Sequence, residues 1–151
     1  MGTLPVDSDT SSKDHRAIFC AAMVLKTCTA SACTKVGVIR SMPDLAGKLA
    51  TAKLLGKEST LEQRAAGLES LSAEEKAMMD QLNSKYKEKF GFPFVICARK
   101  NVVSTIFNGM KARLERDKDL EIATALAEIQ NICWLRLNDI VKDESAIQAV
   151  Y

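Results

Sequence analysis

The sequence predicts an all-α fold, a compact single-domain helical bundle with one extended apolar segment near residues 91–98. Apolar residues recur at helical spacing through most of the chain, and two of these stretches begin with a Ser-x-x-Glu capping pattern. A proline interrupts a short, continuous apolar run. With 151 residues the chain has the usual length of one domain. We expect residues 14–151 to form this domain and the small, polar residues 1–13 to be disordered.

The first third of the chain is expected to contain two helices. Residues 14–38 permit a helix, although Thr, Ser and Cys weaken the pattern towards its end. Pro43 suits the first position of a second helix that runs to about Leu55, because proline lacks only an N–H that has no helical partner there. Gly56 should end this helix.

Capping boxes predict the next two helices. Ser59 and Glu62 have the required spacing, so Ser59 is the expected N-cap of a third helix. Ser72 and Glu75 repeat the pattern before a helix that should run to about Lys89.

The second half of the chain should return to helix after an extended interruption. Pro93 excludes a regular helix interior between Phe90 and Ala98, and the continuous apolar character there indicates a buried extended segment. A helix is expected over residues 103–116, and a last one over residues 120–141 with Asp119 as its cap.

Composition argues against several classes of function. The formal net charge of +2 is too small to indicate a nucleic-acid or membrane-surface partner. The most apolar early stretch, residues 17–25, is too short to span a bilayer. An odd number of cysteines without a CxxC pair, and the single histidine His15, argue against a metal site or a disulfide framework. We interpret the five cysteines as reduced thiols of an intracellular protein: Cys20, Cys28, Cys33, Cys97 and Cys133.

Two charged residues are candidates for chemistry. Arg136 falls inside the apolar stripe of the last helix, so its guanidinium either reaches solvent or a structural carboxylate, or binds an anionic ligand. Glu62 is either a helix-capping carboxylate or, in a dry pocket, a group that transfers a proton. Gln63 beside it offers hydrogen bonds or is simply exposed. The Phe90–Ile96 strip is either core packing or a source of main-chain hydrogen bonds for a ligand with ring amides.

Three motifs in order resemble one enzyme family. They are Met42-Pro43-Asp44-Leu45-Ala46-Gly47, then Ser59-Thr60-Leu61-Glu62-Gln63 continuing to Leu68, and then Phe90-Gly91-Phe92-Pro93-Phe94-Val95-Ile96. Over roughly residues 38–142 the chain resembles the 2-oxo-4-hydroxy-4-carboxy-5-ureidoimidazoline (OHCU) decarboxylases, which complete the conversion of urate to allantoin. The resemblance implies a cofactor-free, metal-free lyase, commonly a homodimer, acting on a small anionic purine derivative to give (S)-allantoin.

The resemblance also implies roles for individual residues. Glu62 and Arg136 match the family's catalytic glutamate and arginine. Met42 stands where the family has a catalytic histidine, and a thioether carries no proton. The alternative is therefore an inactive family member that serves as a ligand-binding or protein-interaction domain. The expected compartment is cytoplasmic or peroxisomal, although the chain ends in Ala-Val-Tyr and not in a Ser-Lys-Leu signal. The expected substrate contacts are Pro43, Ser59, Gln63, Phe92, Phe94, Val95 and Ile96.

Overall fold

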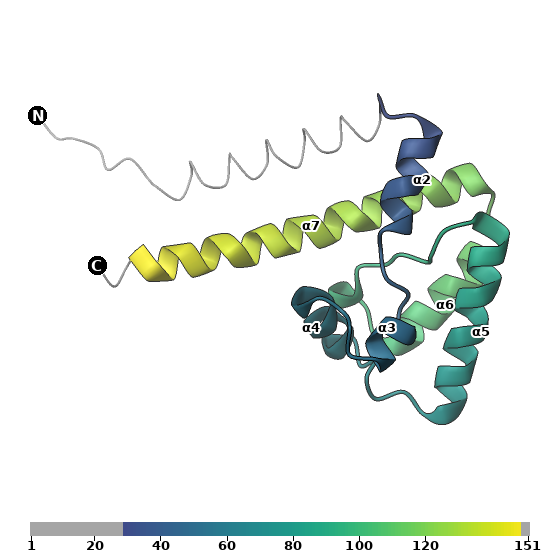
Figure 1. The fold of residues 1–151 in the computed structure, drawn as a ribbon, viewed down its shortest axis with the longest axis horizontal. Coiled ribbons are helices and arrows are strands. Elements are labelled where there is room, and N and C mark those ends of the chain that lie inside the picture. Colours follow the sequence, from purple (N-terminus) through teal and green to yellow (C-terminus); the bar gives the residue numbers. More distant parts are fainter. Residues whose placement is uncertain (1–28, 149–151) are drawn as a thin grey trace, which may run out of the picture. The chain divides into compact units, whose positions relative to one another are not determined.

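The computed structural model describes residues 29–148, with side chains through Asp139, and every regular element in this part of the chain is a helix (Figure 1). The described residues belong to two units, one of residues 31–129 and one of residues 29–30 with 130–148. The all-α prediction is confirmed. The predicted disordered segment 1–13 lies outside the described residues, and so does most of the predicted helix 14–38. Within residues 29–148, no helix is long and apolar enough to cross a membrane.

The larger unit contains most of the helices. Its elements are α2 (Ala32–Arg40), α3 (Lys48–Thr51), α4 (Lys57–Ala65), α5 (Ala73–Phe90), the 3-10 turn η1 (Ala98–Lys100), α6 (Val103–Leu114) and the first turns of α7 (Lys118–Gln148). Helix α5 packs against α6, and α4 packs against η1. The rest of α7 belongs to the second unit.

Local sequence signals explain both ends of α5. The Ser72 side chain accepts a hydrogen bond from the Glu75 N–H at 3.1 Å, and the Glu75 carboxylate accepts one from the Ser72 N–H at 2.9 Å. The predicted capping box is therefore confirmed. Gly91 ends the helix with φ +80°, in the left-handed region where glycine costs least.

The prediction of a helix from Pro43 to Leu55 is wrong, because only Lys48–Thr51 is helical there. Ala46 has φ +47°, which no right-handed helix accommodates, and Lys53, two residues after the end of α3, has φ +55°. Tertiary contacts described below hold this conformation. They override the helical preference of the local sequence.

Two predicted caps also differ from the structure. Gly56 was expected to end a helix but is the N-cap of α4, so Ser59 lies inside that helix and not at its cap. The Thr60 N–H already bonds to the Gly56 carbonyl at 3.0 Å, and Gly56 lies three residues before the predicted cap. At the start of α7 the capping side chain is Asp117, whose Oδ1 accepts from the Leu120 N–H at 2.8 Å, and not the predicted Asp119.

An aromatic cluster forms the centre of the larger unit. Tyr86 and Phe90 of α5 contact each other with ring centroids 4.7 Å apart, and Phe94 meets the Tyr86 ring edge-on at 5.3 Å. Phe92 stacks on Phe90 at 5.8 Å. All four rings are at most 1% exposed. The extended segment after α5 is therefore attached to the core through its phenylalanines.

Candidate functional site

The extended segment Phe92–Cys97, called the 92–97 segment below, has no regular secondary structure and is almost entirely buried. These observations agree with the buried, non-helical strip predicted from Pro93, although Ala98, at the end of the predicted range 91–98, begins the 3-10 turn η1. The side chains of Phe92 and Phe94 point into the aromatic core. A ligand would therefore meet these two residues through their main chain. Buried main-chain polar groups need hydrogen-bond partners, so the partners of this segment identify the edge that a ligand can reach.

One edge of the 92–97 segment is occupied by charged side chains. Arg113 Nη1 donates to the Val95 carbonyl at 2.8 Å, and Glu128 Oε2 accepts from the Cys97 N–H at 2.7 Å. Main-chain groups of an extended chain alternate between its two edges, so residues 95 and 97 use the same edge and residues 94 and 96 the other. Among the described residues, no hydrogen bond reaches the main-chain groups of Phe94 or Ile96. These groups form the opposite edge of the segment.

A buried ion pair fixes the arginine. Arg113 Nε donates to Glu121 Oε1 at 2.7 Å, and the same oxygen accepts from the Tyr86 hydroxyl. Glu121 is fully buried and Arg113 is 5% exposed. The guanidinium also lies over the Phe94 ring, 4.3 Å from its centroid. Burial, and then the bond to Glu121, raise the pKa of the Tyr86 hydroxyl well above its usual range, so this hydroxyl remains protonated as a donor.

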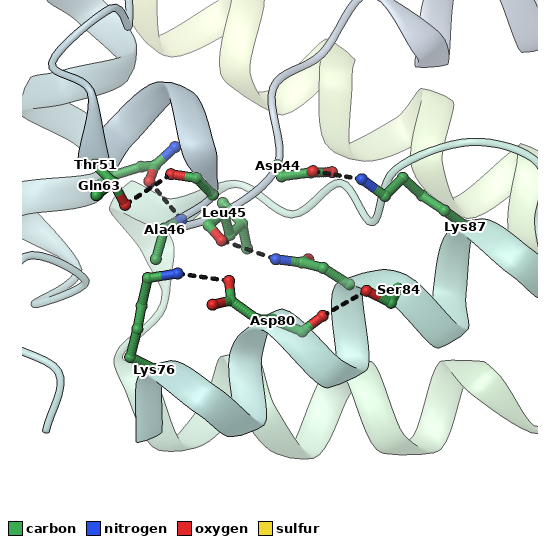
Figure 2. A network of polar contacts seen from close by, with 11 residues as sticks. Asp44, Leu45, Ala46, Thr51, Gln63, Lys76, Asp80, Ser84 and Lys87 are labelled. Carbon is green, nitrogen blue, oxygen red and sulfur yellow. Dashed lines mark hydrogen bonds and ion pairs between the residues drawn. The ribbon is translucent and has the colours of Figure 1, made fainter. Parts of the chain in front are cut away.

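The loop Met42–Gly47, called the 42–47 loop, is held by neighbouring helices (Figure 2). Gln63 Oε1 of α4 accepts from the Ala46 N–H at 2.9 Å, and Asn83 Nδ2 of α5 donates to the Leu45 carbonyl at 3.0 Å. Lys87 Nζ forms an ion pair with Asp44 at 2.6 Å. These three contacts explain why the residues after Pro43 form a turn and do not start a helix.

Helix α4 connects the loop and the segment. Gln63 is 5% exposed and contacts the loop. Glu62, the next residue back, is half-buried and within electrostatic reach of Cys97, since burial, the Glu128 charge and then the Glu62 charge raise the pKa of the Cys97 thiol. Ser59 is half-buried one turn earlier in the same helix. Because α4 also packs against η1, which follows Cys97 directly, the structure brings Glu62 close to the end of the 92–97 segment.

The remaining predicted residues lie elsewhere or have other contacts. Met42 and Pro43 are half-buried in the loop, and the Met42 N–H bonds to the Ile39 carbonyl at 3.1 Å. Arg136 is half-buried in the part of α7 that belongs to the second unit. Of the predicted substrate contacts, Gln63 also lines a hollow of about 570 Å³ together with residues such as Lys53 and Thr60. Among side chains 29–139, no group of three or more His, Cys, Asp or Glu is placed to hold a metal ion.

Sequence reasoning missed three residues that hold the 92–97 segment: Arg113, Glu121 and Glu128. A signal for Arg113 was present, because it follows Ile106 and Met110 on the buried stripe of α6. An arginine on an apolar stripe requires an anionic partner. The same argument singled out Arg136 in the last helix. Nothing in the local pattern identified Glu121 or Glu128, whose partners come from other elements.

Comparison with solved structures defines the class of this fold. An OHCU decarboxylase crystallised in the presence of (S)-allantoin superposes with a TM-score of 0.63, covering 91% of this chain and 84% of that one at 22% identity. A structure of (S)-allantoin synthase gives a TM-score of 0.62 over 82% of this chain and 37% of that one, also at 22% identity. The fold is therefore the helical fold of these enzymes.

Sequence comparison identifies the family. The chain belongs to the OHCU decarboxylase family, whose model matches residues 9–138 and so begins well before residue 38, where the resemblance described above begins. The OHCU decarboxylase of Xenopus laevis is 43% identical over 110 residues, which cover 73% of this chain and 63% of that protein. The one from Amia calva is 45% identical over 106 residues, covering 70% and 61%. The chain thus spans about three-fifths of the length of these relatives.

Proposed function

We infer that this protein removes carbon dioxide from 2-oxo-4-hydroxy-4-carboxy-5-ureidoimidazoline to give (S)-allantoin. The observation that carries this proposal is that the main-chain groups of the buried Phe94 and the half-buried Ile96 have no partner among the described residues. A ring with alternating carbonyl and N–H groups matches such an edge. The half-buried carboxylate of Glu62 lies in the same region, and family membership points to the same substrate.

The mechanism follows from the charge that develops in the reaction. Loss of carbon dioxide leaves an electron pair on a ring carbon, which the adjoining carbonyl and C=N groups delocalise. The protein must hold the scissile carboxylate out of the ring plane and deliver a proton to one face. In our proposal Glu62 orients polar groups and manages this proton, and Arg136 anchors anionic oxygen. Ser59, Gln63 and Pro43 are the further substrate contacts of this proposal.

Substituting the two proposed catalytic residues tests the mechanism. Circular dichroism follows (S)-allantoin formation when the unstable substrate is generated in situ from urate. The spontaneous reaction has no chiral catalyst, so it gives no dichroic signal. Glu62→Gln and Arg136→Ala should each abolish stereoselective product formation, whereas Glu88→Gln, at an exposed position of α5, should not. A residue whose variant retains stereoselectivity has no part in the mechanism.

A second candidate function rests on Met42. A thioether is no acid or base, so a chain with this loop would bind a purine-derived ligand, or a partner protein, without converting it. Binding of (S)-allantoin without stereoselective turnover would favour this candidate over the lyase.

We also propose that the protein forms a homodimer inside the cell, in the cytoplasm or the peroxisome. Among the described residues, Cys33 and Cys97 are thiols that form no disulfide, which fits a reducing compartment. Trp134, on the outside of α7, is 37% exposed and offers an aromatic anchor for a second copy. Light scattering after size-exclusion chromatography should give twice the chain mass, and a single chain mass would exclude the dimer.

A further inference from the structure

Two charged side chains from different helices bind the same edge of the 92–97 segment, and no sequence motif marks either of them. Arg113 comes from α6 and Glu128 from α7, and their contacts with Val95 and Cys97 are 2.8 Å and 2.7 Å long. Resting on the proposed function, we propose that Arg113 and Glu128 are positioning residues that fix this edge and so present the opposite edge, Phe94 and Ile96, to the substrate or its allantoin product.

Arg113 is built to hold a position. Its Nε is bonded to Glu121, its Nη1 to the Val95 carbonyl, and its plane lies against the Phe94 ring. A planar guanidinium held at three sides has little freedom to rotate. The Val95 carbonyl is consequently fixed relative to α6 and α7. Charge-assisted hydrogen bonds of this kind are about twice as strong as neutral ones.

Glu128 fixes the other end of the segment. Its Oε2 accepts from the Cys97 N–H. Cys97 lies one residue past Ile96, where the chain turns into η1. Glu128 is only half-buried, so its carboxylate is not part of the fully buried core. Its charge and that of Glu62 both act on the Cys97 thiol. Glu128 therefore fixes the end of the segment next to η1, and η1 packs against α4, the helix that carries the proposed catalytic carboxylate.

A purely structural role and a positioning role predict different results. If Glu128 only stabilises the fold, removing its carboxylate lowers stability and leaves the affinity of the folded protein for a ligand unchanged. If it positions the segment, ligand affinity falls even when the protein stays folded. A displacement of about 1 Å can cost an enzyme about a hundredfold in rate, so the same displacement should also weaken binding of a ligand at this edge.

The experiment compares four variants in binding (S)-allantoin by calorimetry, at a temperature where all are folded by circular dichroism. Glu128→Ala and Arg113→Lys should weaken binding about tenfold or more, since the first removes the bond to the Cys97 N–H and the second removes the planar guanidinium that bonds Glu121 and Val95. Glu128→Gln keeps an oxygen that accepts from the Cys97 N–H and should bind within about threefold of the parent chain. Met79→Ala, a core truncation in α5, is the control for lost stability and should bind like the parent chain.

Amide hydrogen exchange provides a readout without a ligand. In the parent chain the Cys97 N–H is bonded, and Glu128→Ala should speed its exchange at least tenfold while Glu128→Gln does not. Unchanged exchange, or unchanged affinity in Glu128→Ala and Arg113→Lys, would overturn the positioning role. Failure of the parent chain itself to bind (S)-allantoin would instead refute the proposed function. The two failures are therefore distinguishable.

Discussion

The 42–47 loop and the 92–97 segment are both non-helical and both carry family motifs, but different kinds of contact hold them. The loop is held by two side-chain amides, Gln63 and Asn83, and by the Lys87–Asp44 pair at the surface. The segment is held by an aromatic core and by the buried Arg113–Glu121 pair. Buried charges are costly to separate, whereas exposed pairs contribute little. The segment should therefore be the rigid part of the site and the loop the adaptable part.

The loop should also be where the chemistry of this chain has changed. Met42→His introduces an acid–base group at the position that the resemblance assigns to the catalytic histidine of the family. General acid–base catalysis typically contributes a factor of about a hundred to ten thousand. If the chain is a weakened lyase, (S)-allantoin formation should rise by that factor, measured by circular dichroism. Met42→Leu, which keeps the apolar volume, is the control, and an equally low rate in both variants would show that the loop lacks more than the histidine.

Breaking the buried pair should have the next largest effect. Glu121→Ala leaves the Arg113 charge buried without its partner, which typically costs about 3–5 kcal/mol of unfolding free energy. Urea denaturation measures this loss. Glu115→Ala, an exposed carboxylate just after α6, should leave the midpoint almost unchanged. A similar midpoint in the two variants would contradict the view that the pair holds the segment.

A glycine substitution probes how tightly the loop is packed. A Cβ added to Gly47 would lie 2.6 Å from the Asp44 Cβ, so Gly47→Ala must displace the loop and should cost about 1–3 kcal/mol. Gly37→Ala is a matched control, because a Cβ at that position in α2 meets nothing within 4 Å. It should stabilise the helix by up to about 1 kcal/mol. The midpoint of thermal unfolding should fall in Gly47→Ala and rise in Gly37→Ala. Equal changes of the midpoint in the two variants would refute the tight turn.

The buried tyrosine makes stability depend on pH at the alkaline end. The pKa of Tyr86 is raised in the folded state, so above about pH 10 the unfolded chain loses this proton and the folded chain keeps it. Its contribution to stability is complete below that pH and is lost as pH rises, by about 1.4 kcal/mol per pH unit. Tyr86→Phe should remove this slope between pH 10 and 11 in urea denaturation. An unchanged slope in the variant would assign the dependence to other groups.

The smallest effect is expected at the surface pair of the loop. Lys87 is half-exposed, and Lys87→Ala should cost less than about 1 kcal/mol. This cost should shrink further in 1 M salt, because the charges are screened. A loss as large as that of Glu121→Ala would mean that the loop is not the adaptable region.

The same two regions show what the sequence could predict. Pro93 alone excludes helix in the segment, so its extended form was predictable from local chemistry. The loop conformation depends on Gln63 and Asn83, which are 17 and 38 residues away from their main-chain partners. Local pattern therefore favoured a helix after Pro43 that tertiary contacts prevent. Glu121 and Glu128 were missed for the same reason, since their partners lie on other elements.

The most direct test of this account is to titrate (S)-allantoin into the ¹⁵N-labelled chain and follow the main-chain amide signals. We predict the largest shifts at Phe94 and Ile96, with smaller ones at Glu62 and little change at Ala46, whose N–H is bonded to Gln63. This result would locate the ligand on the opposite edge of the 92–97 segment. Shifts confined to the 42–47 loop, with Phe94 and Ile96 unmoved, would contradict it.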